Sequence, residues 1–267
     1  MMGIESLQDG FGKNSGSNFG NNNTAVSEVL SYIFVFAIIV SVVSLVYLQV
    51  NNIIEDTRDK MKVEGLRQSF KRVQNVIQLT TYSDAPLQTI EFELQGGSLY
   101  LSDDPVFTIM VENDTYTIPT GSLTYEFQDY KIAYENGGIW ESYYGDKRMV
   151  SEPRIFIHHR NIDNQTIIVV VVTRLNGNLS YSGEGSVRLD FNRTNTTIET
   201  YELNGNLRIY YGNSEYSDQW EEFFQSLKTV EGNLASVQVD TVNNYARFSF
   251  NRLIITTYNV TINSIMS

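Results

Sequence analysis

The sequence predicts an α+β protein: a long N-terminal helix, transmembrane and then amphipathic, followed by an antiparallel β-sandwich-like domain with one short helix. Three observations predict it. Residues 26–50 are almost wholly apolar, residues 51–79 keep an apolar stripe at helical spacing, and the chain beyond Thr81 alternates with a period of two between glycine-containing turns. The predicted parts are a leader at 1–25, the helix at 26–80 and the β-rich domain at 81–267.

The leader is rich in glycine, asparagine and serine. Such a composition buries too little apolar surface to offset the entropy of ordering, so residues 1–25 are predicted to be disordered.

The apolar run from Val26 to Val50 predicts one membrane-spanning helix. At ~1.5 Å per residue it crosses a hydrocarbon core of ~30 Å. Charged helical sequence follows it directly, where a secretory signal peptide has a small-residue cleavage site. This pattern favours a retained anchor.

The segment from Thr24 to Leu30, followed by the apolar run, resembles the N-terminus of archaeal type IV pilin-like proteins, the group that includes archaellins. The likeness covers roughly the first 100 residues and is similar to haloarchaeal and methanogen envelope proteins of uncharacterised function. It continues through Glu55 to Asp59, Phe70 to Val73, Ala85-Pro86 and Gly96-Gly97.

The resemblance implies a cytoplasmic leader that a prepilin-type membrane peptidase removes. The cut then falls between Ala25 and Val26, or alternatively between Asn23 and Thr24. The chain departs from the family pattern because the basic residue usual near this junction is missing, and Lys13 is the only basic residue of the leader. After cleavage the helix stays in the membrane or packs with like subunits in a filament core.

Glu28 has two interpretations of equal weight. A cut before Thr24 makes it the fifth residue of the mature chain, where bacterial pilins keep a glutamate that pairs with a neighbour's terminal amine. Alternatively, Glu28 only lies at the membrane interface. There a carboxylate favours a helix N-terminus and costs far less than the ~3 kcal/mol expected at the bilayer centre.

The orientation of the domain is predicted from conflicting signals. Basic residues cluster after the span, so the positive-inside rule alone places the domain in the cytoplasm. The pilin resemblance and the N-glycosylation sequons place it outside the cell, and this is the orientation we expect. About four such triplets are expected by chance. The predicted glycosylation sites are Asn113, Asn164, Asn178, Asn192, Asn195 and Asn259, with a further sequon at Asn22.

The amphipathic part of the helix carries a stripe at Val63, Leu66, Phe70, Val73 and Ile77, spaced 3, 4, 3 and 4. This stripe is either a packing seam between filament subunits or ordinary burial against the chain's own sheet. The second interpretation is slightly favoured.

The β-rich domain is predicted from alternation and turn residues. Gly96-Gly97 predicts a hairpin turn, and the repeated pentapeptide Leu-Asn-Gly-Asn-Leu predicts two more, at Leu175 to Leu179 and Leu203 to Leu207. A short helix is expected from Ser217 to Lys228. Further strands are predicted at Phe107 to Glu112, Thr115 to Ile118, Ser122 to Phe127, Tyr130 to Tyr134, Arg154 to His158, Thr166 to Arg174, Ala235 to Asp240, Tyr245 to Asn251 and Leu253 to Ile262.

Composition argues against several functions. A net charge of −12 without a basic patch speaks against nucleic acid, and the lack of cysteine excludes thiol catalysis and thiolate metal sites. His158 and His159 are adjacent on a strand, point to opposite faces and are poorly placed to chelate one metal. The acidic pairs Asp103-Asp104 and Glu221-Glu222 fit solvated turns or a helix N-terminus. No catalytic, metal-binding or cofactor-binding residue is therefore predicted.

The sequence thus favours a processed, helix-anchored cell-envelope protein that forms a major or minor subunit of a type IV pilus-like surface filament. The alternative is a single-pass anchored binding or sensor module that never polymerises and recognises a partner through tyrosines. An enzyme is the third hypothesis. The tyrosines considered for a carbohydrate- or protein-binding surface are Tyr143, Tyr144, Tyr210, Tyr211 and Tyr216.

Overall fold

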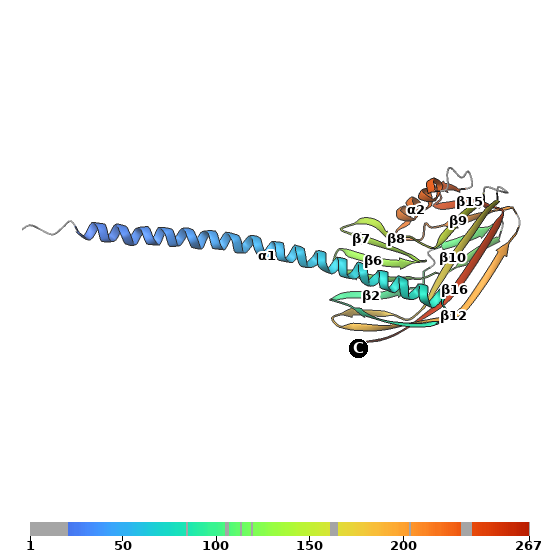
Figure 1. Ribbon diagram of the computed structural model, residues 1–267, viewed down its shortest axis with the longest axis horizontal. Coiled ribbons are helices and arrows are strands. Elements are labelled where there is room, and N and C mark those ends of the chain that lie inside the picture. The colour runs from blue at the N-terminus through green and yellow to red at the C-terminus, as the bar shows by residue number, and fades with distance from the viewer. Residues whose placement is uncertain are drawn as a thin grey trace, which may run out of the picture. The chain divides into compact units, whose positions relative to one another are not determined.

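The computed structural model describes residues 21–83, 85–104, 107–112, 114–118, 120–160, 165–202, 204–230 and 237–266 (Figure 1). The chain divides into two compact units, Met1–Lys60 and Met61–Ser267. The second is called the β unit below.

The helices and strands of the described residues follow one another as one long helix, thirteen strands, a short helix and three strands. In chain order they are α1 (Asn21–Tyr82), β1 (Leu87–Glu93), β2 (Gly97–Ser102), β3 (Phe107–Val111), β4 (Asp114–Ile118), β5 (Ser122–Phe127), β6 (Tyr130–Glu135), β7 (Gly138–Tyr143), β8 (Asp146–Ser151), β9 (Ile155–Arg160), β10 (Gln165–Gly177), β11 (Ser180–Gly183), β12 (Ser186–Tyr201), β13 (Gly205–Tyr210), α2 (Ser217–Val230), β14 (Val237–Asp240), β15 (Tyr245–Phe250) and β16 (Arg252–Met266).

Helix α1 begins at Asn21, so the predicted disorder is wrong for residues 21–25, which are helical. The remainder of the predicted leader lies outside the described residues. The helix ends at Tyr82, where hydroxyls bind its last carbonyls. Thr81 Oγ1 donates to Ile77 O at 2.9 Å and Ser83 Oγ to Leu79 O at 2.6 Å. Pro86, which cannot continue a helix, follows shortly after.

The strands of the β unit form three sheets. Their orders are β1-β12-β16-β10-β9, β11-β2-β5-β6-β7-β8 and β14-β15-β13-β3-β4. Among the described residues the strand pairings are antiparallel except one: β10 and β16 run parallel from Ile167 opposite Arg252 to Gly177 opposite Ile262. Strand β10, which lies between β16 and β9, is buried on both faces from Val170 to Thr173, as its run of valines predicts.

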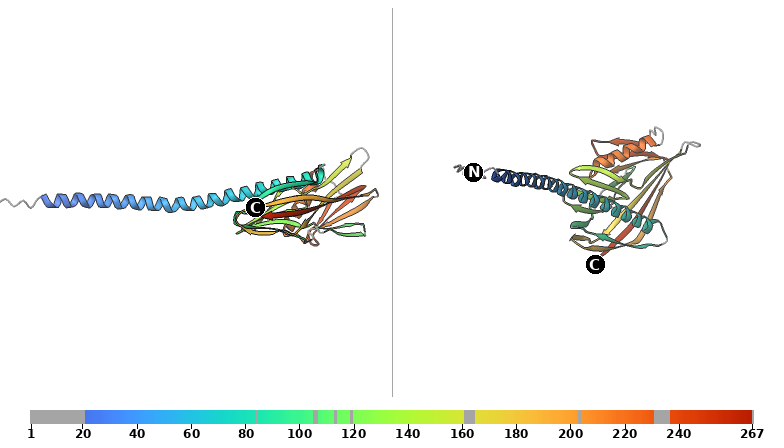
Figure 2. Two further views of the ribbon diagram at one scale, coloured as in Figure 1. Left: turned by 90° about the horizontal axis from the view of Figure 1, so that it is seen from below. Right: turned by 60° about the vertical axis from the view of Figure 1, so that its left-hand side comes forward.

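Two clusters of buried side chains form the core of the β unit. One combines side chains from all three sheets with those of helix α2, and it includes Trp140, Trp220 and Phe248. Helix α2 packs on β14 and β15 (Figure 2). The other cluster contains the apolar stripe of α1 after Met61, with Phe70 against Phe92 at 5.7 Å between ring centroids.

All three predicted hairpins are wrong. Strands β1 and β2 flank a turn at Gln95-Gly96, but β1 pairs with β12 whereas β2 pairs with β5 and β11. The first pentapeptide repeat joins β10 to β11, which lie in different sheets, and the second lies between β12 and β13, which also differ in sheet. Leu203 itself lies outside the described residues. Each turn therefore carries the chain from one sheet to another.

The coarse fold prediction is confirmed: an apolar N-terminal helix, a mostly β unit with antiparallel sheets, and a short helix at Ser217–Val230. The finer prediction of sandwich-like packing stays a prediction.

Candidate functional site

The apolar segment of α1 is the first candidate site. Among the described residues one helix segment, Ser27–Val50, is long and apolar enough to cross a membrane, with a mean hydropathy of 2.8 and none of its residues buried. Its serine hydroxyls donate to carbonyls four residues earlier, Ser31 to Ser27, Ser41 to Ala37 and Ser44 to Val40, at 2.7–2.9 Å. The hydroxyls thus have partners within the helix, as a lipid environment requires.

Glu28 is the only charged residue between Ser27 and Val50 and lies in the first turn of this segment. Its side chain is exposed. The two predicted cleavage junctions, Asn23-Thr24 and Ala25-Val26, lie within the helical backbone of α1. Cleavage at either of the two junctions stays a prediction.

The stripe at the other end of α1 is buried in the β unit. Leu66, Phe70, Val73 and Ile77 are each at most 1 % exposed, and Val63 packs against the same cluster. Of the two interpretations, burial against the chain's own sheets is therefore confirmed. Because these side chains are covered within one chain, they are not available as a seam between subunits.

A buried ion pair fixes this part of α1 to the sheets. Arg67 donates from Nε and Nη2 to the two carboxylate oxygens of Glu141, both at 3.0 Å, and Arg148 also binds this carboxylate. Tyr130 donates its hydroxyl to Glu141 at 2.9 Å. Although burial acts to raise it, the pKa of Glu141 is lowered, because hydrogen bonds from Arg67, Arg148 and Tyr130 together favour the carboxylate.

Two further contacts secure the same helix segment. Gln74 Nε2 donates to Gly137 O at 2.6 Å and to Ser151 Oγ at 2.8 Å. Near the helix end, Arg193 Nη1 donates to Thr81 O at 2.6 Å. No local sequence signal indicates these contacts, because their partners lie far along the chain.

The predicted glycosylation sites fall in different settings. Asn178 is exposed between β10 and β11, and Asn195 is exposed beside a register shift in β12. Asn192 and Asn259 lie half-buried on the neighbouring strands β12 and β16. Asn113 and Asn164 lie outside the described residues. Glycosylation of any of these side chains stays a prediction.

The residues considered for metal or acid chemistry do not converge in the part of the chain that the structure describes. His158 is exposed on β9, and the side chain of His159 lies outside that part. Asp103 and Asp104 are exposed directly after β2, and Asp218 lies in the first turn of α2. Across the described residues no three His, Asp or Glu side chains are grouped to hold a metal ion.

The five tyrosines do not form one surface, so that prediction is wrong as a set. Tyr211 and Tyr216 are core residues, 0 % and 1 % exposed. Tyr143 and Tyr144 are exposed at the turn between β7 and β8. Tyr210 instead pairs with Tyr245, a residue the sequence did not single out, at 5.2 Å between ring centroids.

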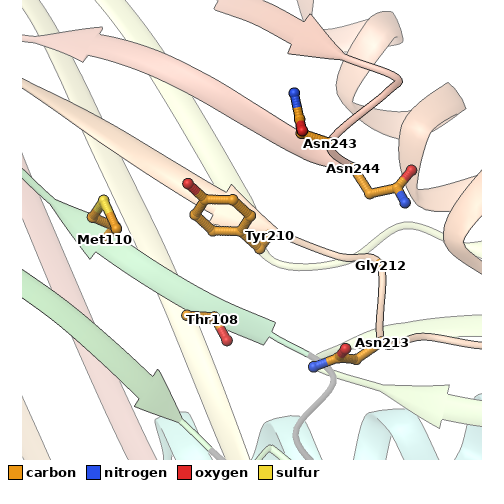
Figure 3. Close-up of a pocket in the computed structure, with 7 residues that line it drawn as sticks. All are labelled: Thr108, Met110, Tyr210, Gly212, Asn213, Asn243 and Asn244. Carbon is orange, nitrogen blue, oxygen red and sulfur yellow. The ribbon is translucent and has the colours of Figure 1, made fainter.

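Tyr210 lines a groove of about 520 Å³, the second candidate site (Figure 3). The groove lies on the sheet β14-β15-β13-β3-β4 and is bordered by two turns. Its lining residues are Thr108, Met110, Tyr210, Gly212, Asn213, Asn243 and Asn244.

Fold and sites together define a helix-bearing β protein with a candidate membrane span and a surface groove. The chain belongs to a family of unknown function (DUF7289), whose model matches residues 24–263. It is similar to two proteins of Archaeoglobus fulgidus described as uncharacterized. One is 25 % identical, covering 75 % of this chain and 83 % of the relative, and the other is 22 % identical, covering 76 % and 82 %. No solved structure matches the chain.

Proposed function

We propose that the chain is a pilin-like protein of the archaeal cell envelope. It is processed by a prepilin-type peptidase, anchored by one membrane-spanning helix, and displays its β unit outside the cell. It serves as a structural subunit, major or minor, of a type IV pilus-like surface filament. Its partners are the membrane, the peptidase and like subunits.

The contrast between the two ends of α1 carries this proposal. After Met61 the apolar side chains form one stripe, and the β unit buries it. From Ser27 to Val50 apolar side chains occupy every face, with Phe34, Phe36, Ile38 and Ile39 between 55 % and 68 % exposed. A helix that is apolar all round requires lipid or other apolar helices around it. A pilin-type helix meets lipid before assembly and like helices after it.

Two results of the comparisons support the proposal. The relatives are archaeal, in keeping with an archaeal pilin resemblance. The family match begins at Thr24, which is one of the two predicted mature termini.

Helix packing can be tested directly because the chain contains no cysteine. Single cysteines are introduced at each position from Phe36 to Val46, and membranes are treated with a lipid-soluble oxidant. Subunits that pack through this helix give covalent dimers at positions three or four apart. A cysteine at Tyr144, exposed in the β unit, serves as a matched control for random collision.

The alternative function is an anchored binding or sensor module, and the groove lined by Tyr210 favours it. This alternative function predicts that cross-linked positions show no helical spacing and that the protein is a monomer in detergent. Deleting the gene would then remove no surface filament. Cross-links with a helical period contradict it.

A further inference from the structure

The groove on the sheet β14-β15-β13-β3-β4 has an uncharged lining, although the chain carries a net charge of −12. Three asparagine amides and a threonine hydroxyl supply hydrogen-bond donors and acceptors beside one tyrosine ring. Figure 3 shows Tyr210 between the turn that carries Asn243 and Asn244 and the strand that carries Thr108 and Met110.

The strand register places the groove side chains in rows on one face. Thr108, Tyr210 and Tyr245 are cross-strand neighbours in one row, and Met110, Arg208 and Arg247 are neighbours in the next. Residues between these rows, such as Ile109 and Ile209, are 1 % exposed on the opposite face, in the core. The groove floor is therefore supported by packed side chains.

The walls of the groove are held by hydrogen bonds. Tyr211 N donates to Asn244 O at 2.9 Å, and Ser214 Oγ donates to the buried carboxylate of Glu135 at 2.7 Å. Gly212 and Asn213 lie between these two anchored residues. In the opposite wall, Asp240 accepts from the backbone and the side-chain amide of Asn243 at 2.9–3.0 Å. These bonds fix the backbone of both walls and the side chain of Asn243, and groups held in this way lose little freedom when a ligand binds.

The lining chemistry fits a hydroxyl-rich ring. Each amide offers a donor and an acceptor, which can bind neighbouring hydroxyls, and the phenol ring of Tyr210 offers an apolar face with a polar end. An apolar peptide finds little here, because Met110 is the only aliphatic side chain in the lining.

Arg208 adds a charge at the border of the groove. Its Nη1 lies 3.5 Å from Met110 Sδ, and its guanidinium carbon lies 5.9 Å from the centroid of the Tyr245 ring. Its Nε is buried without a hydrogen-bond partner, and the ion pairs found among the described residues do not include it. Because Nε has no exposed surface, a ligand in the groove can meet only the terminal nitrogens of the guanidinium, for which a carboxylate is the strongest partner.

We propose that this groove binds a hexuronic acid residue of an acidic polysaccharide. The pyranose ring lies on Tyr210, its hydroxyls bind the amides of Asn213, Asn243 and Asn244, and its carboxylate binds Arg208. This binding site goes beyond the subunit role proposed above and does not depend on it.

The test uses the full chain in a polyoxyethylene detergent, because sugar-headed detergents would compete for the groove. A trimer of galacturonic acid and a trimer of galactose are titrated separately by calorimetry. The expected result is binding of the acidic trimer about tenfold or more tighter than of the neutral one, since a hydrogen bond to a charged group is stronger than one between neutral groups.

Three variants and one control locate the interaction. Tyr210→Ala weakens binding of the acidic trimer at least about tenfold, whereas Tyr210→Phe, which keeps the ring, retains it. Arg208→Gln reduces affinity for the acidic trimer to that for the neutral one. Tyr144→Ala removes an exposed tyrosine elsewhere and leaves binding unchanged. Tryptophan fluorescence confirms that each variant is folded.

Three results would overturn the proposal: no binding of the acidic trimer at millimolar concentration, equal binding of the two trimers, or binding that folded Tyr210→Ala and Arg208→Gln both retain.

Discussion

At the residue scale, two buried glutamates on neighbouring strands have opposite charge environments. Glu141 on β7 is bound by two arginines and its pKa is lowered. Glu135 at the end of β6 accepts hydrogen bonds from Ser214 and Trp220 Nε1, and burial raises its pKa. One carboxylate is held ionised by cations, and the other is buried without an ion pair among the described residues.

The two environments predict opposite dependences of stability on pH. A lowered pKa means that the contribution of Glu141 is present above its ordinary pKa of about 4.3 and is lost as the pH falls through its folded value. A raised pKa means that the contribution of Glu135 is present below its ordinary pKa and is lost as the pH rises through its folded value.

We therefore expect opposite results from Glu141→Gln and Glu135→Gln. Glu141→Gln leaves Arg67 without its carboxylate and lowers the free energy of unfolding at pH 7 by about 3 kcal/mol, with a smaller loss near pH 3. Glu135→Gln removes a buried charge, so the stability of this variant relative to the natural chain rises as the pH increases above the ordinary pKa of a glutamate, about 4.3. Urea unfolding followed by the fluorescence of Trp140 and Trp220 measures both.

Glu91→Gln is the matched control, because Glu91 is exposed on β1. It should change the free energy of unfolding by less than about 0.5 kcal/mol. A loss of stability at Glu141→Gln that is the same at pH 3 and pH 7 would argue against the ion pairs of Glu141 with Arg67 and Arg148.

At the element scale, helix α1 has two parts with different environments. The spacing of its apolar residues predicted the buried stripe correctly, because helical periodicity is a local property that burial within the same unit preserves. The candidate span from Ser27 to Val50 was likewise predictable from composition and length.

At the turns, local sequence predicts that the chain turns but not which strands then pair. Gly96, with φ +83°, and Gly177, with φ +149°, occupy backbone conformations that favour glycine, so a turn at each site was predictable. Which strand pairs with the next one depends on distant segments. Strand β12, which was not predicted, pairs with β16 and β1 although residues 194–200 are exposed and lack apolar alternation.

The candidate sites also differ in whether a local sequence signal predicts them or whether they depend on distant segments. The candidate cleavage and span residues are contiguous in sequence and could be proposed from it. The buried ion pair joins Arg67 to Glu141, which is 74 residues away in the chain. The groove is lined by residues from β3, β13 and two turns. Those combinations exist only after the three sheets form, so no spacing in the chain reveals them.

The role of the stripe gives a prediction at this scale. Phe70→Ala, at a side chain that is 0 % exposed, should lower the free energy of unfolding of the β unit by about 3–5 kcal/mol. Met61→Ala, at a side chain 71 % exposed, should change it by less than about 0.5 kcal/mol. Neither variant should change the amount of chain in the membrane fraction, because the span is untouched. Equal effects of the two substitutions on unfolding would contradict the packing described.

At the scale of the whole molecule, the proposal joins a membrane-spanning segment to an exterior β unit. Six basic residues lie between Arg58 and Arg72, which the positive-inside rule would keep in the cytoplasm. In the proposal, pilin-type processing accompanies an exterior β unit despite these charges. Removal of the leader is therefore the central claim.

That claim is tested most directly by mass spectrometry of the N-terminal peptide, on protein recovered from its native membrane or cell-surface fraction. The proposal predicts a mature terminus at Val26 or at Thr24. A chain that retains its leader and begins near Met1 would contradict it, and the basic residues after the span would then place the β unit in the cytoplasm.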